Sequence, residues 1–121
     1  MRTKAMAFAV LTTLTIAAGC QGAPKSLAEM ARAEQTAAGE EVARRNCGGC
    51  HALGDSLASP RPDAPPLRLL AQRYRTEVLH EELVAGLHFG IADMPKFALS
   101  LAEADALTAY LDSLAKPAPQ E

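Results

Sequence analysis

A five-residue run near the middle of the chain constrains its fold more than any other feature. It reads Cys47-Gly48-Gly49-Cys50-His51, which is a C-x-x-C-H pattern. One helical turn places both thiols on one face, and this is the spacing at which two thiols can add to the two vinyl groups of a haem. The histidine follows directly, so its imidazole comes to one side of the iron and can serve as an axial ligand. The pattern predicts covalent haem attachment.

Three other kinds of site use two cysteines at this spacing. A thioredoxin-like redox pair belongs to a strand-and-helix fold, but the sequence shows almost no β-branched alternation that would build a sheet. A zinc site needs four ligands, and no second C-x-x-C or H-x-x-x-H run follows. A disulfide across so short a loop adds little stability. The sequence favours haem attachment over these alternatives.

Residues 1–19 have the layout of a bacterial export signal. Arg2 and Lys4 precede an apolar stretch at residues 5–18, and no acidic residue occurs in this region. A membrane-spanning helix needs about 20 apolar residues, so we expect cleavage before Cys20 and not a permanent span. The expected location is the periplasm of a Gram-negative bacterium.

Cys20 is left over once Cys47 and Cys50 hold a haem, and an odd exported thiol needs a role. The run Ala17-Ala18-Gly19-Cys20 resembles the lipobox of bacterial lipoproteins, although Ala17 stands where leucine is typical. The resemblance implies that Cys20 is lipidated and tethers the protein to a membrane. Ordinary signal-peptidase cleavage after a small-x-small site is the alternative.

Composition narrows the function further. The formal net charge is −2, and no basic cluster interleaved with aromatic residues suggests nucleic-acid binding. Aromatic residues make up 4% of the chain and tryptophan is absent, which is little for the core of a small single domain. A buried haem would supply the missing apolar volume.

Local signals predict helices separated by loops. Ser26 and Glu29 form a capping box that starts a helix running toward Arg45, just ahead of the haem motif. Four prolines make residues 54–66 a loop, and residues 67–87 are helical again in two pieces, with Gly86 as a terminator. The apolar positions of that region are Val78, Leu79, Leu83 and Leu87.

A second capping box, Ser100 with Glu103, starts the last helix, which Lys116-Pro117 ends. Its predicted apolar stripe consists of Leu101, Ala104, Leu107, Thr108, Leu111 and Leu114. Between the helical regions lies a glycine-interrupted loop, residues 86–99, which carries Met94-Pro95.

From Ala38 onward the chain resembles a small class I cytochrome c. The matching positions are Gly39, where the first and last helices of the family cross, the segment 103–111 of the last helix, and the small-Pro-x-Leu element Ala64-Pro65-Pro66-Leu67. The resemblance implies an all-α fold of about three to five helices around one covalently attached haem c. The domain would span residues 38–116, with residues 20–37 as tether and start of the first helix and residues 117–121 as a tail.

The resemblance also implies a set of cofactor-binding residues. Pro65 would accept a hydrogen bond from the imidazole of His51, Leu67 would complete the same element, and Met94 would be the second axial ligand. His88 is the rival ligand because it lies in the same loop, whereas His80 is expected on the surface. The candidates for binding the haem propionates are Arg73, Tyr74 and Arg75.

The expected function is one-electron transfer by a periplasmic carrier that is not an enzyme. With two side chains on the iron, small molecules would have no access to it, and redox partner proteins would dock transiently. Two alternatives remain, namely a haem c subunit of a membrane-bound oxidoreductase complex and an open-iron cytochrome that binds or senses a gas.

Overall fold

The computed structural model describes residues 26–86, 94–96 and 98–115, and these residues form four helices and no strand. The helices are α1 (Leu27–Asn46), α2 (Leu67–Arg73), α3 (Thr76–Ala85) and α4 (Leu101–Ala115). The all-α prediction is therefore confirmed. The export signal, Cys20, the tether, His88 and the C-terminal tail lie outside the described residues.

Helix α1 begins where its capping box predicts. The backbone N–H of Ser26 donates to Glu29 Oε2 at 2.8 Å, and the N–H of Glu29 donates to Ser26 Oγ at 3.2 Å. Because the first N–H groups of a helix have no partner inside it, this reciprocal pair stabilises the first turn. The helix ends at Cys47, whose N–H bonds to the carbonyl of Ala43. The haem motif thus starts at the C-terminal end of α1.

Helix α4 begins with the second capping box, which is also confirmed. Glu103 Oε2 accepts from the N–H of Ser100 at 3.1 Å, and Ser100 Oγ accepts from the N–H of Glu103 at 3.3 Å. The predicted stripe is buried except for Leu101, which is 64% exposed. Leu101 occupies the first turn of α4, so helical spacing alone placed it wrongly in the core.

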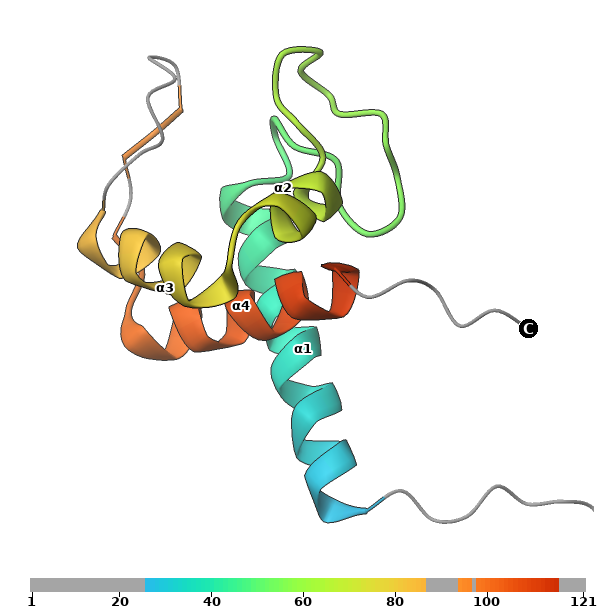
Figure 1. The fold of residues 1–121 in the computed structure, drawn as a ribbon, viewed down its shortest axis with the longest axis vertical. Helices are drawn as coiled ribbons and strands as arrows, with labels where there is room; N and C mark the ends of the chain where they lie inside the picture. The colour runs from blue at the N-terminus through green and yellow to red at the C-terminus, as the bar shows by residue number, and fades with distance from the viewer. Residues whose placement is uncertain (1–25, 87–93, 97, 116–121) are drawn as a thin grey trace, which may run out of the picture.

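Helices α1 and α4 cross at Gly39, and this contact organises the domain (Figure 1). A Cβ atom built on Gly39 would lie 1.9 Å from the carbonyl oxygen of Ala106 and 2.8 Å from Cβ of Tyr110. Only a glycine allows the two backbones to approach this closely. The crossing that the resemblance implied is therefore present. The N-terminal half of α1 extends beyond the other helices and is exposed.

Helices α2 and α3 both pack on α4 (Figure 1). Residues 54–66 form no helix, as their prolines predicted, and α3 ends at Gly86, which has φ +69°. This left-handed conformation suits a glycine C-cap. Leu79 is buried, whereas Val78, the neighbouring apolar position, is 43% exposed.

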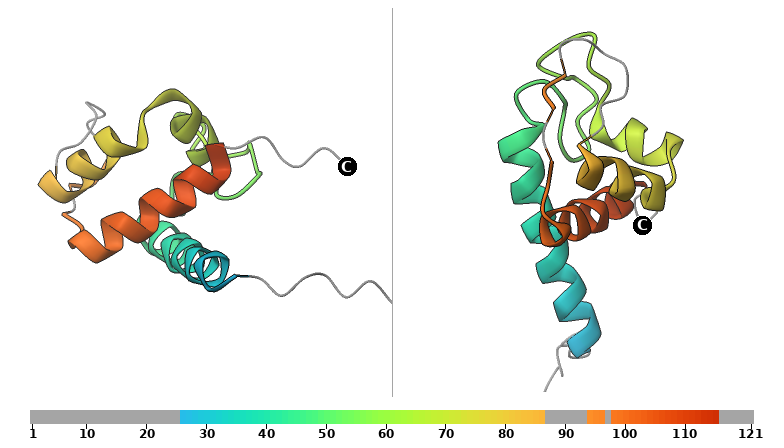
Figure 2. Two further views of the ribbon diagram at one scale, coloured as in Figure 1. Left: turned by 60° about the horizontal axis from the view of Figure 1, so that its bottom comes forward. Right: turned by 90° about the vertical axis from the view of Figure 1, so that its left-hand side faces the viewer.

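In the right-hand view of Figure 2, α1 stands on one side of the domain and α2 and α3 stand on the other. The buried side chains that hold the arrangement include Val42, Leu67, Leu79, Leu107 and Leu111. Among the described residues, no helix has the length and apolar character needed to span a bilayer.

Candidate functional site

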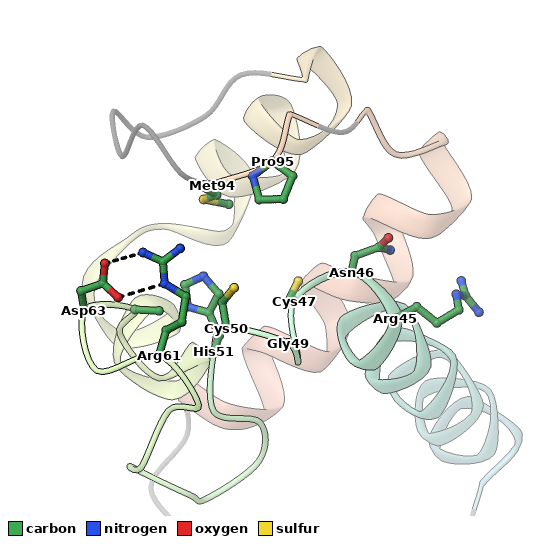
Figure 3. Close-up of a pocket in the computed structure, with 11 residues that line it drawn as sticks. Arg45, Asn46, Cys47, Gly49, Cys50, His51, Arg61, Asp63, Met94 and Pro95 are labelled. Carbon is green, nitrogen blue, oxygen red and sulfur yellow. Dashed lines mark hydrogen bonds and ion pairs between the residues drawn. The ribbon is translucent and has the colours of Figure 1, made fainter.

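The turn after α1 brings Cys47, Cys50 and His51 together. The N–H groups of Cys50 and His51 both donate to the carbonyl of Cys47, at 3.0 and 2.9 Å. These bonds continue the helical path for one turn, so the two sulfur atoms and the imidazole face a common space (Figure 3). Both cysteines are free thiols in this structure.

The imidazole of His51 has a fixed partner behind it. Its Nδ1 lies 2.6 Å from the carbonyl oxygen of Pro65. Because a carbonyl oxygen only accepts hydrogen bonds, Nδ1 carries the proton and the lone pair of Nε2 is free for a metal. This is the contact that the resemblance implied for Pro65. Leu67 supports this contact. Its N–H donates to the carbonyl of Ala52 at 3.0 Å, and this bond holds the start of α2 beside the segment that follows His51.

Met94 lies opposite His51 across the same space (Figure 3). It comes from the segment between α3 and α4, and it lines both cavities described below. The structure therefore brings the predicted imidazole and thioether to one site from positions far apart in the sequence. His88, the rival ligand, is outside the described residues. His80 is held at the surface by a contact of 2.8 Å between its Nε2 and Oδ1 of Asp105.

The inner part of the site is a cavity of about 340 Å³ with apolar walls. Leucines of α2, α3 and α4 form most of its lining, together with Cys47, His51, Pro65 and Met94. These leucines are Leu67, Leu69, Leu70, Leu79, Leu83, Leu107 and Leu111. Arg73 and Tyr74 also line this cavity, whereas Arg75 is not among its lining residues and pairs with Glu77. Of the three predicted propionate partners, the structure thus places two at the site.

The outer part is a cavity of about 250 Å³ that shares Cys47, His51 and Met94 with the inner one. Its rim carries polar side chains that sequence reasoning did not identify, namely Arg45, Asn46, Arg61 and Asp63 (Figure 3). The guanidinium of Arg61 donates two hydrogen bonds to the carboxylate of Asp63, at 3.0 and 2.6 Å. These bonds lower the pKa of the Asp63 carboxyl. Arg45 and Asn46 reach the rim because they end α1 directly before the haem motif, whereas Arg61 and Asp63 reach it through the path of the proline-rich loop.

The protonation of Cys47 follows from its surroundings. Burial disfavours the charged thiolate and raises the pKa of Cys47 to about 11. The group is therefore a neutral thiol at physiological pH.

The residues present fit a haem better than the alternative sites. Within the described ranges, no three His, Cys, Asp or Glu side chains cluster in a way that could hold a zinc ion. The same part of the chain has no sheet to carry a thioredoxin-like pair. What it does have is two thiols, an imidazole with a free Nε2, an opposing thioether and a wall of leucines. This donor set suits iron within an apolar macrocycle.

Comparisons with known proteins agree with this geometry. A protein-family model described as cytochrome c oxidase, cbb3-type, subunit III matches residues 34–111. Neither the search of curated proteins nor the search of solved structures found a significant match. The family match covers well over half of the chain and includes the crossing glycine, the haem motif and Met94. The chain therefore belongs to this family and is a class I cytochrome c, an electron-transfer module with one covalently bound haem c and redox partners.

Proposed function

We propose that this cytochrome is a periplasmic one-electron carrier in which His51 and Met94 bind the two axial positions of the haem iron. One observation carries the proposal: an imidazole fixed by Pro65 at 2.6 Å faces Met94 across a leucine-lined cavity. A one-electron carrier requires a fixed ligand on each face of the iron and a pocket with apolar walls that excludes water.

Cys47 and Cys50 attach the haem. Each thiol would add across one vinyl group of the haem, with the sulfur bonding to one carbon and the thiol hydrogen to the neighbouring carbon, so that no group leaves. The two cysteines leave the same helical turn, which matches the two attachment points on one edge of the porphyrin. His51, which follows Cys50 directly, would then supply its Nε2 as a ligand to the iron.

The axial residues determine what the site does. Haem c supplies an iron that takes up and releases one electron. Pro65 orients the imidazole of His51 and increases its donor strength, and the soft thioether of Met94 favours the reduced iron relative to a second imidazole. With His51 and Met94 as its two ligands, the iron would have no position left for a substrate. The leucine wall lowers the local dielectric and limits reorganisation when the charge changes.

The replacement Met94→Ala tests the second axial ligand. We expect the oxidised wild type to show the weak far-red band of methionine bound to ferric iron, and we expect Met94→Ala to lose this band. The variant should also have a lower reduction potential and bind carbon monoxide in the reduced state, because an axial position becomes open. Visible spectroscopy and redox titration of the holoprotein measure all three effects.

His88→Ala is the matched control, because His88 is the rival ligand in the same loop. It should leave the band, the potential and the carbon monoxide behaviour unchanged. If His88→Ala opens the iron and Met94→Ala does not, the ligands are two histidines. If the wild type itself binds carbon monoxide readily, the iron is open and a gas-binding role replaces the carrier role.

The membrane tether is tested at Cys20. We propose that the export signal is removed and that the lipidated Cys20 holds the protein at a periplasmic membrane surface. Cys20→Ala should then release the holoprotein into the soluble periplasmic fraction, as measured by fractionation and haem staining. Wild-type protein that is already soluble and carries no acyl mass would show ordinary cleavage instead.

A second candidate is supported by the description of the matching family, which names a subunit of an oxidase. In that case the cytochrome domain would pass electrons within a membrane-bound complex. Mild detergent extraction followed by purification of the haem-containing protein distinguishes a free carrier from a complex subunit. A free carrier elutes at its own mass and docks through a small, transient interface, whereas a subunit co-purifies with the complex.

A further inference from the structure

Tyr110 connects α4 with the segment that follows His51. The backbone N–H of Gly54 donates a 2.8 Å hydrogen bond to the hydroxyl oxygen of Tyr110, which is 56 positions away in the sequence. The tyrosine is only 4% exposed, and its Cβ lies against Gly39 at the crossing of α1 and α4. One side chain therefore contacts both the helix crossing and the haem-binding segment.

The same segment has other hydrogen bonds, but their partners come from the adjoining loop and from α2. The N–H of Arg61 donates to the carbonyl of Cys50 at 3.2 Å, and the N–H of Ala52 donates to Ser59 Oγ at 3.0 Å. These two bonds hold the segment to its own loop, and the N–H of Leu67, which donates to the carbonyl of Ala52 at 3.0 Å, holds it to α2. The bond to Tyr110 differs because its acceptor lies on α4, at the crossing with α1.

Gly54 is suited to this bond by its conformation. It has φ +58°, in the left-handed region that favours glycine, and the backbone turns there only three residues after His51. Displacement of this turn would move the backbone that carries the imidazole. The carbonyl of Pro65 fixes one ring nitrogen, but Pro65 lies in the loop just before α2 and not on α4.

We propose that Tyr110 is a positioning residue for His51: its hydroxyl holds the turn at Gly54 against α4 and so fixes the orientation of the imidazole. This inference rests on the proposed role of His51 as an iron ligand. Burial raises the pKa of the Tyr110 hydroxyl, so the group stays neutral over the physiological range and the bond persists there.

The test compares Tyr110→Phe with Thr108→Val in the holoprotein. Phenylalanine keeps the aromatic ring at the crossing and removes only the acceptor for Gly54. Thr108→Val also removes a buried hydroxyl from α4, but that hydroxyl bonds only to carbonyls of its own helix, Ala104 at 2.8 Å and Asp105 at 3.0 Å. The control therefore reproduces the loss of a hydroxyl without touching the haem-binding segment.

Two readouts are needed. Amide hydrogen exchange at Gly54 should become about tenfold faster in Tyr110→Phe, which is the effect of losing one net hydrogen bond, and should stay unchanged in Thr108→Val. Electron paramagnetic resonance of the oxidised protein should show altered g values in Tyr110→Phe alone, because these values depend on the orientation of the axial imidazole.

The outcomes separate this inference from the proposed function. Unchanged exchange at Gly54 or unchanged g values in Tyr110→Phe, with a normal wild-type spectrum, would refute the positioning role and leave the carrier function intact. A lower melting temperature of Tyr110→Phe with unchanged g values would show that the hydroxyl has only a structural role, and this result too would refute the positioning role. A wild-type spectrum without a histidine-ligated low-spin iron would overturn both.

Discussion

Replacing Cys47 and Cys50 together by alanine should yield a chain that carries no covalent haem and does not fold cooperatively. The first effect follows directly from the loss of both thiols. The second follows from the position of the cavity, because six of the seven leucines that line it also form the packing surfaces of α2, α3 and α4. Without haem, these side chains have no partner on one side.

The expected size of this effect comes from the cavity volume. A cavity of about 340 Å³ in an otherwise packed core costs on the order of 8 kcal/mol, at roughly 24 cal/mol per Å³. Small domains have a total stability of about 5–15 kcal/mol. The chain has no tryptophan and only 4% aromatic residues, so it has few large side chains that could collapse into the space. The loss is therefore comparable with the whole stability of the domain.

Circular-dichroism melts and limited proteolysis of periplasm-expressed protein measure this outcome. Cys20→Ala is the matched control, because it removes a thiol outside the haem motif and should leave haem content and melting unchanged. A double variant that melts cooperatively and resists protease as well as the control would show that the haem is not part of the core.

The capping boxes and the haem motif could be predicted because their interactions are local. Ser26 with Glu29, Ser100 with Glu103, and the turn from Cys47 to His51 each involve residues within one helical turn, so sequence spacing determines the contacts. The contact between His51 and Pro65 is not local. It was predicted only because the small-Pro-x-Leu element resembles that of a known family.

Other features could not be predicted because they depend on how distant segments meet. Val78 and Leu101 have helical spacing suited to a core, but both are exposed, since the spacing does not show where the partner helix ends. Arg61 and Asp63 reach the rim of the site only through the path of the proline-rich loop. The bond between Gly54 and Tyr110 joins two elements whose relative placement no local signal specifies.

Gly39→Ala should destabilise the holoprotein by about 3 kcal/mol or more, against the usual trend for helices. In an exposed helix, replacing glycine by alanine stabilises by about 1 kcal/mol, because alanine has the higher helix propensity. At Gly39, however, the new Cβ would lie 1.9 Å from the carbonyl oxygen of Ala106, which is backbone and cannot rotate away. Helices α1 and α4 would have to separate, and the side chains buried at their crossing would lose contact.

Denaturant unfolding of the oxidised holoprotein measures this change, with Ala38→Gly as the control. Ala38 is the exposed neighbour of Gly39 on α1, so its replacement by glycine should cost only the helix propensity, about 1 kcal/mol. Gly39→Ala should lower the free energy of unfolding more than this control does, although it raises the helix propensity of α1. Because α1 leads directly into Cys47, the shifted helix should also lower the yield of attached haem. A Gly39→Ala protein as stable as the wild type would mean that the two helices do not cross at this distance.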